Sequence, residues 1–172
     1  MGLFETIKYK TILKDKKIEI RKYDDILLAS TISNMNTSQD SGFNDVFRYI
    51  SGNNDKNAKI SMTTPVVTYE ENDLLVTGFY VPSKYTKETI PKPVEKSVFI
   101  NEFKDSYYAV IRFRGRWTKN NFDKFDNLLQ EYLKFNNFNK LSKRIIMRYQ
   151  PSFIPAIFRR NEIAYQIDYK NN

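Results

Sequence analysis

The sequence predicts an α+β fold, a distorted antiparallel β-barrel or strongly curved sheet flanked by two α-helices. Short stretches of alternating apolar and polar residues, separated by polar turns, predict many strands. Two amphipathic segments predict the helices, and both kinds of element recur in the two halves of the chain. A length of 172 residues suits one domain, so we expect residues 1–172 to form a single domain.

The chain opens with strands. Residues 6–13 and 17–23 alternate around a polar turn, which predicts a hairpin, and a mostly apolar strand follows at 26–32. In the second strand Ile18 and Ile20 share one face, which leaves Glu19 and Arg21 on the other.

A first helix follows, with Thr37 or Ser38 as its expected N-cap and Ser51 near its end. Gly52 is expected to terminate it in a left-handed conformation. Its apolar stripe consists of Phe43, Val46, Phe47 and Ile50.

Residues 59–67 read as the start of a long strand rich in β-branched side chains. Pro65 cannot donate a ladder hydrogen bond, so we expect an edge position or a bulge there. The later elements are a turn at 71–73, a strand at 74–81, a loop at 82–96, strands at 97–103 and 107–113, a helix from Thr118 to Phe135, a strand at 144–149, a loop at 150–160 and a strand at 161–169. The apolar positions of the second helix are Phe122, Phe125, Leu128, Leu129, Tyr132 and Leu133.

An internal repeat underlies this order. Residues 20–29 match residues 100–109 in the placement of Ile, an aromatic, Asp and Ala. A helix and then strands follow each stretch, which predicts two β-α-β-β units related by a pseudo-twofold axis. Their sheets are expected to merge, with both helices packed outside.

The composition excludes several kinds of site. The chain has no Cys and no His, which rules out disulfides, thiolate metal sites, a Cys nucleophile and an imidazole base. A Ser-His-Asp triad, an ordinary zinc site and a His-ligated haem are therefore excluded.

The net charge of +8 favours carboxylate or phosphate ligands, an anionic membrane surface or nucleic acid. The basic residues are dispersed along the chain, so we expect a solvated surface and no nucleic-acid partner. There is no signal-peptide pattern and no apolar run near the roughly 20 residues of a spanning helix. We therefore expect a soluble cytoplasmic protein with no membrane span.

Five stretches resemble the SOUL haem-binding family, in order along nearly the whole chain. The clearest is Lys-Ile-Ser-Met-Thr-Thr-Pro-Val at 59–66, which resembles the family signature Lys-Ile-x-Met-Thr-x-Pro-Val. The others are the Glu-x-Arg-x-Tyr strand at 19–23, the helix end at 43–54, the Phe-x-Gly strand end at 113–115 and the Pro-rich C-terminal stretch at 149–162. The resemblance implies a GyrI-like fold.

It also implies non-covalent binding of haem or another anionic porphyrin without a His ligand. In such family members the porphyrin lies on a shallow apolar patch formed by the first helix and the loop before the last strand, with basic residues near the propionates. The positions that match are Phe43, Val46, Phe47, Arg48, Ile50, Lys59, Phe153, Ile154, Phe158 and Arg159. Some family members use a His as the axial ligand of iron, which this chain lacks, and we assign no catalytic residue and no metal-ligating residue.

Other interpretations stay open. The helix residues are also typical of a buried stripe, whereas Phe153, Ile154 and Ile157 lie in a Pro-bounded loop where apolar side chains often bind a ligand or partner. Glu162 is a candidate catalytic acid of a GyrI-like sensing or hydrolytic domain, or a member of an ion pair with the neighbouring arginines. A protein-interaction module is a further alternative. We leave enzymatic activity open, favour a binding role, and expect a monomer.

Overall fold

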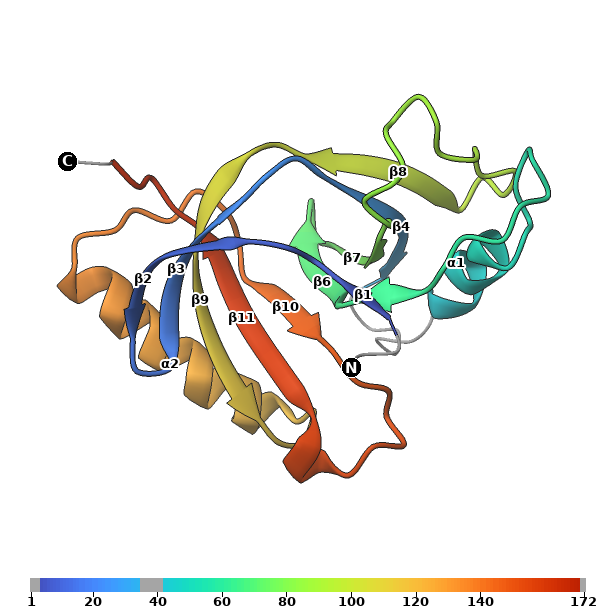
Figure 1. Cartoon of the computed structure of the whole chain (residues 1–172). Helices are drawn as coiled ribbons and strands as arrows, with labels where there is room; N and C mark the ends of the chain where they lie inside the picture. Colours follow the sequence, from blue (N-terminus) through green and yellow to red (C-terminus); the bar gives the residue numbers. More distant parts are fainter. Residues whose placement is uncertain (1–3, 35–41, 171–172) are drawn as a thin grey trace. The chain divides into compact units, whose positions relative to one another are not determined.

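The computed structural model describes residues 4–34 and 42–170 and divides the chain into two compact units (Figure 1). The first unit contains Met1–Ile7 and Asp25–Lys104, and the second contains Lys8–Asp24 and Asp105–Asn172. Among the described residues, no helix is both long and apolar enough to cross a membrane.

The first unit is an antiparallel sheet with one helix on it. Its strands run in the order β6-β7-β4-β8, and a short parallel pair joins β1 to β5. Helix α1 buries Val46, Tyr49 and Ile50 in a core that includes Phe79 of β7 and Val81, the residue after that strand. The elements are β1 (Glu5–Thr6), β4 (Ile26–Asn34), α1 (Phe43–Ile50), β5 (Thr63–Thr64), β6 (Val66–Glu71), β7 (Leu74–Tyr80) and β8 (Val98–Phe103).

The second unit repeats this plan, with strand order β2-β3-β9-β11-β10 and α2 across one face (Figure 1). Its core joins α2 to the sheet, where the rings of Phe113 and Phe125 stack with centroids 4.2 Å apart. The elements are β2 (Lys10–Asp15), β3 (Ile18–Tyr23), β9 (Ser106–Arg114), α2 (Lys119–Phe135), β10 (Ile145–Arg148), the 3₁₀ turn η1 (Ala156–Phe158) and β11 (Arg160–Gln166).

The predicted α+β class and the repeat are confirmed. The series β4-α1-β6-β7 corresponds to β9-α2-β10-β11, and the other half of the sequence adds β8 to the first sheet and β2 and β3 to the second. Ile100 of β8 pairs with Ala29 in the first unit, and Ile20 of β3 pairs with Ala109 in the second. The matching residues of the sequence repeat therefore make the same pair in both sheets.

Several local predictions are also confirmed. Asn72 and Asp73 form the turn between β6 and β7 with φ values of 49° and 61°. Gly115 ends β9 with φ 134°, a conformation that glycine adopts without strain. The Thr118 side chain caps α2 by accepting a hydrogen bond of 3.3 Å from the Asn121 N–H.

The predicted strand over 59–67 is wrong in its first half. The N–H of Ile60 donates to the Ile50 carbonyl at 2.8 Å, which ties residues 59–62 to the end of α1, and β5 begins at Thr63. Pro65 follows a cis peptide bond and separates β5 from β6, in line with the expected irregularity.

Three further expectations need adjustment. The predicted strand over 6–13 is divided, because residues 7–9 lie outside both β1 and β2. Leu128 was expected on the buried stripe of α2, yet 45% of it is exposed, because the sheet covers a narrower arc of the helix. The proposed N-caps Thr37 and Ser38 lie outside the described residues, and α1 begins at Phe43 after Gly42.

Candidate functional site

The ten residues implied by the family resemblance belong to two sets. Six lie in the first unit and four in the second, and each set is described within its own unit. The first set is Phe43, Val46, Phe47, Arg48, Ile50 and Lys59, and the second is Phe153, Ile154, Phe158 and Arg159.

Helix α1 divides its members of the set between core and surface. Val46 and Ile50 are buried, so they hold the helix on the sheet. Phe47 is 43% exposed, and its ring stacks on Phe43 with an interplanar angle of 11°. Phe43 in turn packs against Phe79 of β7, with ring centroids 5.2 Å apart. The outer face of α1 therefore carries one exposed aromatic ring backed by a second.

Helix α1 and the turn after it carry two exposed cations. Arg48 is exposed and donates to Asp45 at 2.7 Å, with Glu95 3.9 Å away. The hydrogen bond from Arg48 is the main cause that lowers the pKa of Asp45. Lys59 is also exposed and follows the turn after α1. Both cations are accessible, and Arg48 already has carboxylate neighbours.

The turn between α1 and Lys59 is built around Asn54. Its side-chain amide donates to the carbonyls of Tyr49 at 3.1 Å and Ala58 at 2.8 Å, and its oxygen accepts from the N–H of Lys56 and Ala58. The cavity lined by α1, residues 60–63 and β7 measures about 10 Å³, which is room for about one water molecule. Residues 60–63 are thus packed against α1 and leave no ligand-sized space between them and the helix.

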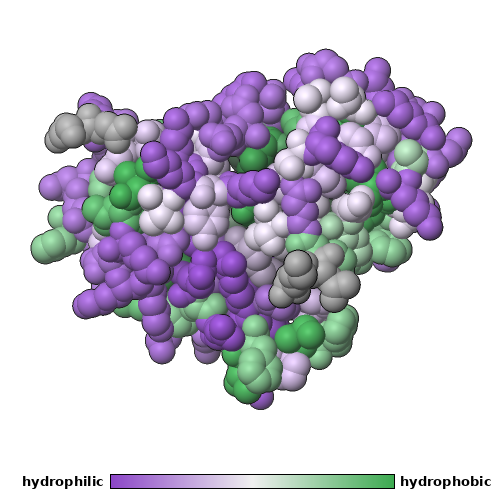
Figure 2. All heavy atoms as spheres, in the orientation of Figure 1, coloured by the Kyte–Doolittle hydropathy of each residue, from purple (hydrophilic) through white to green (hydrophobic). Residues whose placement is uncertain are grey.

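The second set lies in the loop between β10 and β11. Phe153 is 81% exposed, Ile157 69% and Phe158 58%, whereas Ile154 is half-buried. In Figure 2 hydrophobic colouring gathers at the lower edge of the molecule, where Figure 1 places this loop. An apolar cluster of this kind usually marks a binding surface.

Arg159 holds the backbone of that loop in place. Its Nε donates to the Ile154 carbonyl at 2.7 Å, and its Nη2 donates to the Ser152 carbonyl. Its guanidinium also lies over the Trp117 ring, 4.8 Å from the centroid. Arg159 is therefore engaged in shaping the loop backbone.

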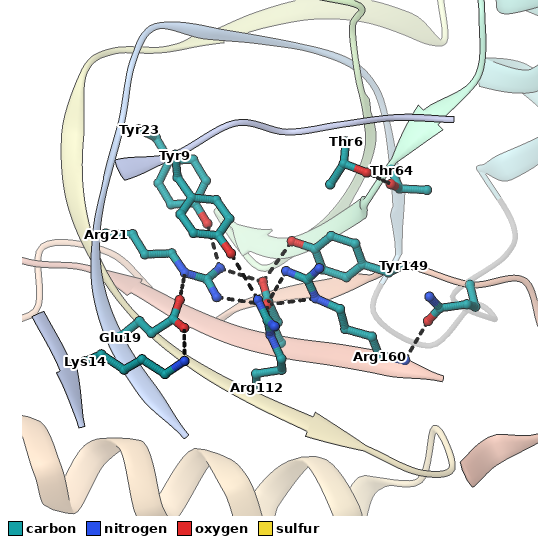
Figure 3. Close-up of polar contacts among 12 residues, drawn as sticks. Thr6, Tyr9, Lys14, Glu19, Arg21, Tyr23, Thr64, Arg112, Tyr149 and Arg160 are labelled. Atoms are coloured by element: carbon teal, nitrogen blue, oxygen red, sulfur yellow. Dashed lines mark hydrogen bonds and ion pairs between the residues drawn. The ribbon is translucent and has the colours of Figure 1, made fainter. Parts of the chain in front are cut away.

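A buried ion cluster lies on the face of the second sheet opposite α2. Glu162 is fully buried, and its two carboxylate oxygens accept six hydrogen bonds. Arg21 binds both oxygens at 2.8 and 3.0 Å, while Arg112 and Arg160 bind Oε1 and the Tyr149 hydroxyl binds Oε2. Figure 3 shows these donors, from β3, β9, β11 and the end of β10, converging on one point.

Arg21 contacts three further side chains. Its Nε donates to Glu19 at 2.7 Å, its Nη1 donates to the Tyr23 hydroxyl at 3.0 Å, and its guanidinium lies 4.0 Å from the Tyr9 ring centroid. With Arg112, Arg160 and Lys14, which pairs with Glu19 at 3.6 Å, the cluster holds three guanidinium groups, one ammonium group and two carboxylates, a net charge of +2.

The cluster keeps Glu162 ionised. Burial alone would raise the pKa of Glu162, but the hydrogen bonds and charges of Arg21 and Arg160 outweigh it and hold the pKa at about 2. Burial raises the pKa of Tyr149 well above its usual range. A carboxylate with this pKa is not a proton donor near neutral pH, and its lone pairs are already taken by neighbouring side chains.

The predicted ion pair between Arg160 and Glu162 is present, at 2.8 Å. Sequence reasoning missed that Arg21 and Arg112 bind the same carboxylate. The available signal was the alternation of Glu19, Arg21 and Tyr23 on one strand face, but only the strand order brings that face to Glu162.

Within residues 4–34 and 42–170, no group of three or more acidic side chains is arranged to hold a metal ion. The whole chain also has no His or Cys. A ligand that carries a metal would therefore meet apolar and basic side chains on the surfaces described above.

Solved structures with little sequence identity have the same fold. The EcmrR C-terminal domain matches with a TM-score of 0.65 and 10% identity, over 94% of this chain and 99% of that one. A hydrolase from Listeria innocua matches with a TM-score of 0.59 and 8% identity, over 91% and 94%. These likenesses show the fold alone, which confirms the GyrI-like architecture that the sequence resemblance implies.

Sequence comparison gives the family. Heme-binding protein 2 of Homo sapiens is 32% identical over 107 residues, and that of Mus musculus is 30% identical over 107 residues. Each match covers 56% of this chain and 52% of the relative, so it spans about half the length of either protein. Residues 4–166 match the family described as SOUL heme-binding protein. The chain belongs to the SOUL heme-binding protein family.

Proposed function

We propose that this protein binds haem or a related anionic tetrapyrrole non-covalently, on exposed apolar side chains flanked by basic residues. Family membership over residues 4–166 supports a tetrapyrrole as the ligand. The observation that carries the proposal is the outer face of α1, where the exposed ring of Phe47 is backed by Phe43 and the next residue, Arg48, is also exposed. A flat macrocycle needs an apolar face, and its carboxylates pair well with a guanidinium.

The residues of this chain fit such a ligand in two roles. We assign direct contact to exposed side chains, and we assign support to those that hold them in place. In the first unit the contact residues are Phe47, Arg48 and Lys59, supported by Phe43, Val46 and Ile50. In the second unit they are Phe153 and Phe158, supported by Ile154 and Arg159. Because Asp45 already pairs with Arg48, a propionate has to compete with that carboxylate.

The absence of His and Cys sharpens the proposal. The macrocycle and its carboxylates provide the binding energy in this proposal, and no His or Cys contributes a bond to iron. Metal-free protoporphyrin IX is then expected to bind within about a factor of three of hemin, and esterification of the propionates is expected to weaken binding at least about tenfold.

Titration of the purified chain with hemin, followed by the Soret band, tests the proposal. We expect saturable binding at micromolar ligand. Phe47→Ser and Phe153→Ser should each weaken it about tenfold, because burying a Phe side chain contributes about 1.5–3 kcal/mol. Phe135→Ser is the matched control, since Phe135 is 87% exposed on α2 and belongs to neither surface. Unsaturable binding, or equal losses in all three variants, would refute the proposal.

A GyrI-like small-molecule site centred on an acidic residue is less well supported. The buried carboxylate that such a site would use is Glu162, and three arginines and Tyr149 already occupy its oxygens. A cationic ligand would have to displace these guanidinium groups, and a hydrolytic role would need a proton that Glu162 does not hold near neutral pH.

A further inference from the structure

One end of the second unit carries an exposed apolar loop whose flanking segments are positively charged. There β9 ends, β11 begins, and the loop 151–159 projects beyond the sheet (Figure 1). The most exposed apolar side chains of this loop are Phe153, Ile157 and Phe158. Monomeric proteins rarely expose three large apolar side chains within six residues unless the surface binds something.

The loop holds its shape without these three side chains. Its backbone closes on itself through hydrogen bonds from the N–H of Ile154 to the Pro151 carbonyl at 3.2 Å and from the N–H of Phe158 to the Pro155 carbonyl at 2.9 Å. Arg159 fastens the loop to Trp117, whose Nε1 donates to Asn161 at 2.8 Å. The apolar side chains are therefore presented outward on a fixed support.

The base of the loop is cationic. Residues 113–122 and 149–161 contain five Lys and Arg side chains; Lys119 pairs with Asp123 and Arg160 with Glu162, whereas Arg114, Arg116 and Arg159 bind no acidic side chain among the described residues. The two segments meet, because Arg114 of β9 pairs in register with Arg160 of β11 and the Asn161 amide donates to the Gly115 carbonyl at 3.2 Å. Arg114 and Arg116, on either side of the Gly115 turn, are both exposed.

We propose that this end of the second unit docks on an anionic lipid membrane surface. Phe153, Ile157 and Phe158 insert at the level of the headgroups, while Arg114 and Arg116 face the lipid phosphates. Aromatic and aliphatic side chains with a basic flank are the combination that binds an interface without spanning it. This activity goes beyond tetrapyrrole binding and needs no haem.

The shape of the tip favours a membrane over an acidic protein or a nucleic acid. A protruding loop inserts into a fluid interface without a complementary groove, whereas a protein partner needs a pocket shaped for it. Single-stranded nucleic acids bind along a basic groove lined with stacking rings, whereas the exposed arginines here lie on either side of one turn at Gly115. The arginines that flank the loop are complementary in charge to anionic lipid headgroups.

Co-sedimentation of the haem-free full chain with lipid vesicles tests this proposal. We expect binding to vesicles that contain phosphatidylserine and little binding to phosphatidylcholine alone, with the affinity falling as salt rises from about 0.1 M to about 0.5 M. The double variants Phe153→Ser/Phe158→Ser and Arg114→Glu/Arg116→Glu should each lower the partition coefficient at least about tenfold. The matched control Phe135→Ser/Lys134→Glu, on exposed residues of α2, should leave it unchanged.

Three results would overturn the proposal. They are equal binding to neutral and anionic vesicles, wild-type binding by both loop-end variants, and binding of an acidic polypeptide but not vesicles with the same dependence on Phe153 and Phe158. All variants are surface changes, and thermal unfolding checks their folding. The Arg114→Glu/Arg116→Glu variant should keep the hemin affinity of the wild type, so a failure of membrane docking is distinguishable from a failure of haem binding.

Discussion

Replacing Glu162 by Gln tests whether the ion cluster stabilises the second unit. The variant keeps the size of the side chain but removes the charge that Arg21, Arg112 and Arg160 share. Arg21 is fully buried, so its charge loses the carboxylate that binds it at two points and keeps only Glu19 in a place that water does not reach. Breaking a buried ion pair in this way costs about 3–5 kcal/mol, and we expect the free energy of unfolding to fall by that amount.

The dependence on pH gives an independent measure of the same interaction. The folded-state pKa of Glu162, about 2, lies below its ordinary value of 4.5. The cluster therefore contributes its full stabilisation above the pKa of the unfolded carboxyl, and that contribution is lost as the pH falls from 4.5 towards 2. At about 1.4 kcal/mol per pKa unit, the loss is about 3 kcal/mol.

Urea unfolding at neutral and acidic pH measures both effects. The Glu162→Gln variant should be less stable than the wild type at neutral pH, and this difference should shrink as the pH approaches 2. Glu131→Gln is the control, since Glu131 is an exposed residue of α2. A loss below about 1 kcal/mol, or a difference that does not change with pH, would refute the assignment.

Other substitutions test the packing of each unit. Leu129→Ala should lower the free energy of unfolding by about 2–5 kcal/mol, because Leu129 is fully buried. Leu128→Ala should lower it by less than about 1 kcal/mol, because Leu128 is 45% exposed. Similar losses for the two variants in urea unfolding would contradict the core assignment. Tyr49→Phe removes the 2.6 Å hydrogen bond to the buried Pro91 carbonyl and should cost about 1–2 kcal/mol by the same measurement, and an unchanged midpoint would contradict this. Arg159→Ala frees two loop carbonyls and should speed proteolysis within 151–158, and an unchanged cleavage rate would show that the loop keeps its shape without it.

Local chemistry explains which parts of the fold were predictable. The turn at Asn72 and Asp73, the glycine at 115 and the cap at Thr118 each depend on the conformational preferences of a few adjacent residues. The internal repeat was readable because Ile20 and Ala109 make the same pair as Ile100 and Ala29.

The features that the sequence did not predict depend on contacts between residues far apart in the chain. Glu19 and Arg21 alternate with Ile18 and Ile20, which indicates a charged strand face but not that this face is buried. The Glu162 cluster exists only because β3, β9 and β11 lie side by side, and no local pattern encodes that order. Leu128 belongs to the apolar stripe by spacing, yet how far the sheet reaches around α2 decides its burial.

The exchange of strands between the two halves has a consequence for biosynthesis. The strand β3, made early, pairs with β9, which leaves the ribosome more than eighty residues later. During translation the hairpin β2–β3 has no sheet to join, while the first unit can close once β8 has emerged. A nick within residues 82–96 would therefore leave an N-terminal piece that lacks β8 of the first sheet and a C-terminal piece that lacks β2 and β3 of the second, so each piece needs the other to complete its sheet.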